Sequence, residues 1–185
     1  MAMKYFTPEL YVQLQILDDE ATFDAANNAW SQAVDRYDRH LDQIRGRLPS
    51  SVQGLLNSCN LHDADVLAIK QSGNTLVIVL QLDAPPNEIL ELAYTLDSDP
   101  IIIPVSLPAE YCSERPEWMY DEIDVELPSS PNQAPVFLHT VQLSNGYQLQ
   151  IRFKALDVKR STAVLPAPRS FCVSPAATGA ASQQA

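Results

Sequence analysis

Between residues 137 and 154, apolar and polar side chains alternate one by one on both sides of a Ser-Asn-Gly turn at 144–146. Alternation of this kind predicts a β-hairpin in which each strand buries one face and leaves the other face wet. A two-residue loop would set the apolar row of one strand against the polar row of the other. A three-residue loop with Gly146 in the left-handed conformation aligns the two apolar rows, and it places His139 on the buried face.

The first third of the chain has the spacing of amphipathic helices. A Thr-Pro-Glu start signal at 7–9 predicts a short helix over about 8–16. A longer apolar stripe predicts one long helix over about 21–47, and a third, short helix is expected at 50–56. The stripe of the long helix consists of Trp30, Val34, Tyr37, Leu41, Ile44 and Leu48. We interpret this stripe as a core seam in preference to a dimer interface, because it spans few heptads.

From residue 61 onward the pattern changes to that of strands. Apolar or alternating runs predict strands at 66–69, 75–82, 88–96 and 118–127, in addition to the hairpin. The run at 88–96 also fits a helix, and its Tyr-Thr end favours a strand. Four prolines between 100 and 116 predict a loop with at most one helical turn near 109–112. Helices followed by an antiparallel meander of five or six strands define an α+β fold, with the long helix covering one sheet face.

Length and composition fit one soluble domain. The chain has 185 residues, of which 46% are hydrophobic, and no apolar run approaches the length of a membrane span, about 18 residues. We expect a single domain over 1–158, with a helical part at 1–60 and a β part at 61–158. The Ala-, Pro- and Ser-rich segment 159–185 is expected to be disordered. Three scattered cysteines and the lack of an N-terminal signal core favour the cytoplasm.

Acidic residues are concentrated in one stretch. The formal net charge is −11, and residues 83–126 hold 12 acidic residues and one basic residue. Such a surface repels nucleic acid and anionic membranes and favours basic proteins or cations. Neither nucleic acid nor membrane is therefore expected as a partner, although solubility alone also accounts for the charge.

Three carboxylates on the predicted strand 118–127 share one face, and we call Glu122, Asp124 and Glu126 the acidic stripe. Like charges in a row predict an exposed face on an edge strand. There they prevent pairing with other sheets or bind a basic partner. Asp121 points to the opposite, apolar side, where a carboxylate needs a hydrogen-bond donor.

Two His–Asp combinations are the candidates for chemistry. His62 and Asp63 lie where the first strand is expected to start, either as a metal ligand or general base or as a local turn. Asp121 and His139 both face inward from late strands, and we favour a hydrogen bond between them that stabilises the sheet. All four together would suit zinc, manganese or iron, but their spacing matches no recognised metal motif. No cofactor is therefore predicted, and a divalent metal is the alternative.

Four short motifs occur in order along the chain. They are Met3-Lys4-Tyr5-Phe6-Thr7, Leu61-His62-Asp63-Ala64, Tyr120-Asp121-Glu122 and Leu143-Ser144-Asn145-Gly146. Together they resemble a bacterial family catalogued as a domain of unknown function. The resemblance covers about residues 3–158 and implies that Met3 is the natural first residue, but it implies no activity. The Leu-His-Asp-Ala motif alone also resembles small proteins of bacterial toxin–immunity loci.

Three hypotheses follow. The sequence lacks a nucleophile elbow, a P-loop and a dinucleotide fingerprint, so the leading hypothesis is a non-enzymatic, immunity-like module that binds a basic protein through the acidic stripe. The alternative is a metal-dependent enzyme that uses the two His–Asp combinations. The third is a structural subunit that oligomerises along Trp30, Tyr37 and Ile44.

Overall fold

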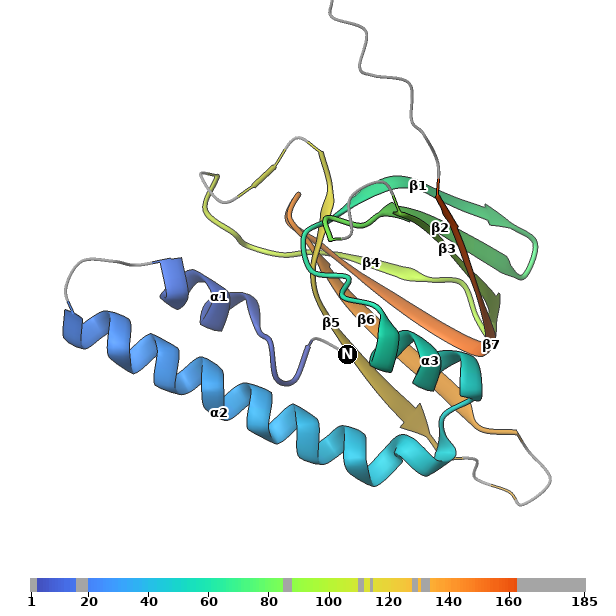
Figure 1. Cartoon of the computed structure of the whole chain (residues 1–185), viewed down its shortest axis with the longest axis horizontal. Helices are drawn as coiled ribbons and strands as arrows, with labels where there is room; N and C mark the ends of the chain where they lie inside the picture. Colours follow the sequence, from blue (N-terminus) through green and yellow to red (C-terminus); the bar gives the residue numbers. More distant parts are fainter. Residues whose placement is uncertain are drawn as a thin grey trace, which may run out of the picture.

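Helices come first in the chain and strands follow (Figure 1). The computed structural model describes residues 3–15, 20–84, 88–109, 112–113, 115–127, 130 and 134–162. The helices in these residues are α1 (Pro8–Gln15), α2 (Glu20–Ile44), the 3-10 turn η1 (Arg45–Arg47) and α3 (Ser50–Ser58). The strands are β1 (Ala64–Ser72), β2 (Thr75–Gln81), β3 (Glu88–Leu96), β4 (Ile101–Pro104), β5 (Glu117–Glu126), β6 (Val136–Leu143) and β7 (Tyr147–Thr162).

The predicted α+β class is confirmed, and so is the strand assignment of 88–96. The described residues form seven strands, not five or six, because β4 lies in the proline-rich stretch that we expected to be a loop. Ile101–Pro104 pairs with the start of β7 at the edge of the sheet, where a proline is tolerated. The helical turn expected near 109–112 lies partly outside the described residues.

The antiparallel strands close into a barrel. Their order is β3-β2-β1-β5-β6-β7-β4, and β3 pairs additionally with β7. β7 makes this closure possible because it is long: its first half pairs with β6 and β4, and its second half pairs with β3. The ring closes between β1 and β5 over two residue pairs, Ala64 with Trp118 and Asp65 with Glu117. We call this short pairing the seam.

The hairpin has the predicted three-residue loop and register. His139 pairs with Ile151, Phe137 pairs with Phe153, and Gly146 has a φ of +81°. The expectation of a wet outer face on this hairpin is wrong. The buried residues of that face include Leu138, Thr140, Gln142, Gln148 and Gln150. One reason is that the N-terminal segment lies against β6, where Lys4 and Tyr5 line a small cavity together with Leu138 and Thr140.

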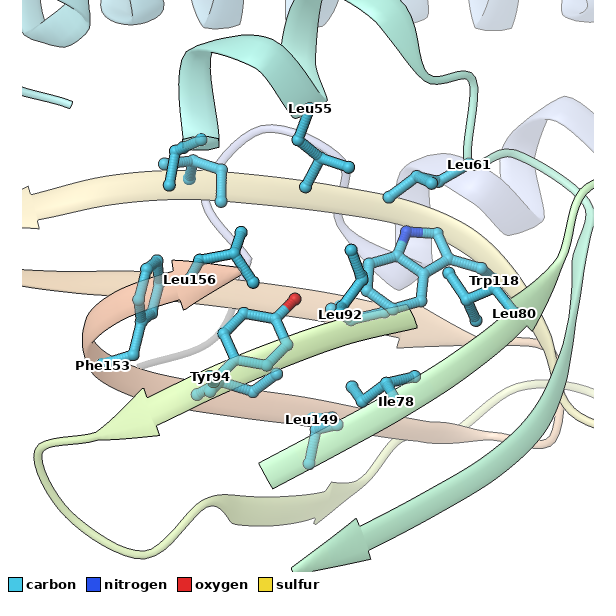
Figure 2. Packing of buried hydrophobic residues seen from close by; sticks show 14 of the residues in the cluster. Leu55, Leu61, Ile78, Leu80, Leu92, Tyr94, Trp118, Leu149, Phe153 and Leu156 are labelled. Carbon is cyan, nitrogen blue, oxygen red and sulfur yellow. The ribbon is translucent and has the colours of Figure 1, made fainter. Parts of the chain in front are cut away.

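The core lies inside the barrel and continues to the helices. In Figure 2, Leu55 of α3 and Leu61 lie over the side chains of Trp118 and Leu92 in the barrel interior. α2 lies along β5 (Figure 1), and Tyr37 and Ile44 from its apolar stripe are buried within the chain. The interpretation of the stripe as a core seam is thus confirmed for these two residues, and oligomerisation along the helix stays a hypothesis. None of the described helices is long and apolar enough to cross a membrane.

The ordered β-structure extends beyond the predicted domain boundary. β7 continues to Thr162, four residues past the expected end at 158, because its second half pairs with the whole of β3. Residues 163–185 lie outside the described residues, so the disorder expected there stays a prediction.

Candidate functional site

Segments that are far apart in the sequence meet around the ring of Tyr120 on β5. The His62 ring lies edge-on to it at 5.0 Å between centroids, Trp30 lies at 4.6 Å, and Tyr11 lies at 6.0 Å. Burial raises the pKa of Tyr120 to about 12, and the nearby Tyr11 hydroxyl and Asp63 carboxylate add to this effect. Tyr120 therefore keeps its phenol proton at neutral pH.

The turn before β1 presents His62 and Asp63 to solvent. His62 N–H donates to Oδ1 of Asn60 at 3.2 Å, and Asp63 N–H donates to the carbonyl of Trp118 at 2.8 Å. Asp63 has a φ of +63°, a left-handed conformation that aspartate adopts more readily than most non-glycine residues. Nδ1 of His62 lies 2.8 Å from Oδ2 of Asp63, and these side chains are 43% and 59% exposed. The predicted local turn is confirmed, and it holds an accessible imidazole–carboxylate pair.

Two cavities adjoin this pair and share His62, Met119 and Tyr120 in their linings. The first, which we call the apolar cavity, has a volume of about 280 Å³ and is lined mostly by apolar side chains of α2, α3 and β5, together with Asp121. The second, which we call the acidic cavity, has a volume of about 440 Å³. Its charged lining residues among those described are Asp63 and Glu117, and no lysine or arginine is among them.

Asp121 and His139 are hydrogen-bond partners, as predicted, and they belong to a longer series of buried hydrogen bonds. Nε2 of His139 lies 3.0 Å from Oδ2 of Asp121, and Nδ1 lies 2.9 Å from the Tyr94 hydroxyl. The indole N–H of Trp118 donates to Oδ1 of Asp121 at 2.8 Å. Because an ionised carboxylate is only an acceptor, Nε2 of His139 carries a proton and donates it to Asp121. These contacts bind β3, β5 and β6 together.

Electrostatics determine the protonation of Asp121 and Tyr94 in this group. Burial opposes ionisation of Asp121, yet the hydrogen bond and electrostatic attraction of His139, together with the hydrogen bond from Trp118, outweigh it and hold the carboxyl pKa below its ordinary value. Burial raises the pKa of Tyr94 well above its ordinary value, and the charge of Asp121 adds to the shift. At neutral pH Asp121 is therefore an anion, and Tyr94 keeps its phenol proton.

The four metal-ligand candidates form two pairs with different surroundings. His139 is fully buried, and both of its ring nitrogens are engaged by Tyr94 and Asp121, so neither nitrogen is available to a metal. His62 and Asp63 lie at the surface. Within the ranges that the structure describes, no group of three or more His, Cys, Asp or Glu residues is arranged to hold a metal ion.

The acidic stripe is engaged within the chain, so the expectation of an exposed acidic face is wrong. Glu122 is buried and accepts the backbone N–H groups of Lys4, Tyr5 and Phe6 at 2.8, 2.6 and 2.8 Å. Asp124 pairs with the Lys4 ammonium and lies 3.3 Å from Nε2 of His40, and Glu126 pairs with the guanidinium of Arg152. These carboxylates anchor the N-terminal segment and β7.

Several residues of the site were not predicted. Tyr94 lies in a row of buried leucines on β3, and a hydroxyl in such a row needs a partner, which was an available signal. Glu117 and Tyr11 gave no signal, because nothing local to either residue indicates that the acidic cavity forms between them.

The chain matches no protein-family model, and no curated protein matches it significantly. The four short motifs nevertheless meet in space. Glu122 holds the N-terminal motif, His62 contacts Tyr120, and Ser144 exchanges two hydrogen bonds with the backbone of Glu117 at 2.9 and 3.0 Å. Membership of the family that these motifs resemble remains a hypothesis.

Proposed function

We propose that the protein is a non-enzymatic, immunity-like binding module that recognises a basic protein. The observation that carries the proposal is the acidic cavity, in which Asp63 and Glu117 lie beside the aromatic rings of Tyr11 and Tyr120. Carboxylates beside aromatic faces are suited to a guanidinium or ammonium group, through charged hydrogen bonds and cation–π contact. A lysine or arginine side chain of the partner is the group that we expect to enter.

The surrounding charge and backbone support this recognition mode. A net charge of −11 attracts a basic partner from a distance and increases the rate of encounter. The left-handed turn at Asp63 fixes its carboxylate at the cavity before binding, which lowers the entropic cost of recognition. The docking residues in this proposal are therefore Asp63 and Glu117, since the acidic stripe is paired within the chain.

The proposal includes a cytoplasmic location. The two cysteines in the described part of the chain, Cys59 and Cys112, are free thiols, which is compatible with a reducing compartment. An immunity-type role would place the protein in the same compartment as the basic protein that it restrains.

A capture experiment with charge-matched variants tests the function. Three forms of the protein are immobilised on a resin and incubated with cell extract. They are the wild type, the test variant Asp63→Asn/Glu117→Gln and the control variant Glu91→Gln/Asp157→Asn. The control removes the same charge from the β3–β7 surface, where neither residue lines the two cavities. Asparagine tolerates the left-handed backbone at 63, so the test variant keeps its turn.

We expect the wild type and the control variant to retain the same basic protein. The Asp63→Asn/Glu117→Gln variant should bind it with a Kd about tenfold higher, which corresponds to a loss of about 1.4 kcal/mol of binding free energy. Equal retention by the two double variants would contradict recognition through the acidic cavity. Absence of any basic protein from the wild-type capture would contradict the binding function itself.

A further inference from the structure

The C-terminal part of β7 is tied to the edge of the apolar cavity. Two positions before this strand ends at Thr162, the guanidinium of Arg160 donates to the carbonyl of Ser58 at 2.6 Å and to Sγ of Cys59 at 2.7 Å. Cys59 belongs to the lining of the apolar cavity. The chain beyond Thr162 therefore continues from a strand that is fixed to this cavity.

One short run beyond Thr162 combines a base with an aromatic residue. In the sequence 163–185, Arg169 is the only charged side chain and Phe171 is the only aromatic one. They are two positions apart, so in an extended chain both side chains point to the same side, about 7 Å from each other. Pro166 and Pro168 precede them and disfavour a helix there.

The length of the chain allows this run to reach both cavities. Nine positions separate Thr162 from Phe171, and an extended chain of that length spans up to about 30 Å. From Cys59, which Arg160 contacts, the three positions to His62 span at most about 11 Å. His62 belongs to the wall that the apolar and acidic cavities share, so the run can lie across this wall.

The chemistry of the two cavities matches the two side chains. The apolar cavity has a volume of about 280 Å³ and is lined mostly by apolar side chains. A cavity of about 150 Å³ with such a lining already holds a benzene molecule, so a phenylalanine ring fits. The acidic cavity presents Asp63 and Glu117, whose charge complements that of Arg169. Residues 159–185 include no acidic side chain, so this segment is attracted to the acidic remainder of the chain.

We propose that Arg169 and Phe171 of the same chain occupy the two cavities in the free protein. The Arg169 guanidinium bonds to the carboxylates of the acidic cavity, and the Phe171 ring lies in the apolar cavity. The C-terminal segment is then an internal competitor of the basic partner. This competition rests on the proposed function, whereas the docking itself does not. The disorder expected for the rest of 163–185 is unaffected.

Photo-cross-linking in the full chain tests the docking. In one form p-benzoylphenylalanine replaces Phe171, and in the control form it replaces Thr178; each is irradiated in dilute solution, and mass spectrometry locates the product. We expect the probe at 171 to attach within its own chain to residues that line the apolar cavity, such as Leu56 or Met119. Attachment to a second copy, or the same products from the probe at 178, would overturn the proposal.

A peptide added in trans measures the competition without the unidentified partner. The probe, acetyl-Ala-Pro-Arg-Ser-Phe-amide, has the sequence of residues 167–171. It is titrated into ¹⁵N-labelled full chain, as wild type and as Arg169→Gln/Phe171→Ser, whose substitutions lie beyond β7. The variant should bind the peptide with a Kd at least about threefold lower than that of the wild type, because the tethered run occupies the wild-type cavities first. Equal Kd values, or no saturable binding to the variant, would overturn the proposal.

The two proposals fail in different ways. If the capture experiment retains a basic protein but the peptide binds both forms equally, the docking is refuted and the proposed function stands. If the cross-link and the peptide give the expected results but no basic protein is captured, the docking stands and the proposed function is refuted.

Discussion

The hydroxyl oxygen of Tyr37 accepts the backbone N–H of Ile123 at 2.7 Å. A side chain of α2 thus accepts a backbone hydrogen from the edge of β5 opposite β6, which among the described residues pairs with β1 only at Trp118 and Glu117. Burial raises the pKa of the Tyr37 phenol, and the charge of Asp121 adds to the shift, so this hydroxyl stays protonated. The long helix therefore takes part in the hydrogen bonding of the barrel in addition to covering its core.

Replacement of this hydroxyl should destabilise the fold. Tyr37→Phe keeps the ring but leaves the Ile123 N–H without its acceptor, and we expect the free energy of unfolding to fall by about 1–3 kcal/mol. Urea denaturation measures the change. Tyr147→Phe, at a hydroxyl on a side chain that is 45% exposed, serves as the control and should change stability by less than about 0.5 kcal/mol. Similar values for both variants would show that the Tyr37–Ile123 bond contributes nothing specific.

Glu122 should act as the anchor of the N-terminal segment. In Glu122→Gln one oxygen becomes an NH₂ group, which cannot accept a hydrogen bond. Depending on which oxygen is replaced, either the N–H of Lys4 or the N–H groups of Tyr5 and Phe6 lose their acceptor. We expect a loss of about 2 kcal/mol and faster hydrogen exchange at residues 4–6. Glu91→Gln, which breaks an exposed pair with Lys159, should change stability by about 0.5 kcal/mol or less. Slow exchange at residues 4–6 in Glu122→Gln would refute the anchoring role.

The stability contributed by Asp121 should depend on pH. Its pKa is lower in the folded chain than in the unfolded chain, where an aspartate titrates near about 3.9. The ionised group therefore stabilises the fold above about pH 4, and this stability is lost as the pH falls through the folded-state pKa. Asp121→Asn should be less stable than wild type at pH 7, and the difference should shrink toward about pH 3. A difference that is constant with pH, measured by urea denaturation, would contradict this linkage.

Replacement by alanine should have opposite effects on stability at two glycines. Gly146 has a φ of +81° in the hairpin loop, so Gly146→Ala should destabilise the protein by about 1 kcal/mol through backbone strain. Gly54 lies exposed in α3 with nothing within 4 Å of an added Cβ, so Gly54→Ala should stabilise it by about 0.5–1 kcal/mol. Thermal denaturation of both variants checks the sign, and a gain at 146 would contradict the three-residue loop.

Local patterns predicted the elements that depend on local physics. The alternation around His139 predicted the hairpin register, because a slip of one residue would have turned an entire apolar row out of the barrel interior. The inward orientation of Asp121 followed from the same reasoning on the neighbouring strand.

Contacts between residues far apart in the sequence could not be predicted from such local patterns. The alternation around Glu122 gave the face of its side chain, but the N–H groups that bury it come from a segment 116 to 118 positions earlier in the chain. The pairing of β3 with the second half of β7 likewise follows from barrel closure, which no single stretch of sequence encodes. The acidic cavity could not be predicted for the same reason, because α1, the turn at Asp63 and β5 together form it.

The seam gives the barrel a mechanical weak point. β1 and β5 are joined by two residue pairs, whereas their other neighbours are paired along most of their length. Both cavities border this junction, since His62 precedes β1 and Tyr120 lies on β5. An occupant of either cavity would therefore contact both sides of the gap, and its binding free energy would add to the resistance of the ring against opening. Under the proposed function, recognition of a partner would thus be coupled to closure of the barrel.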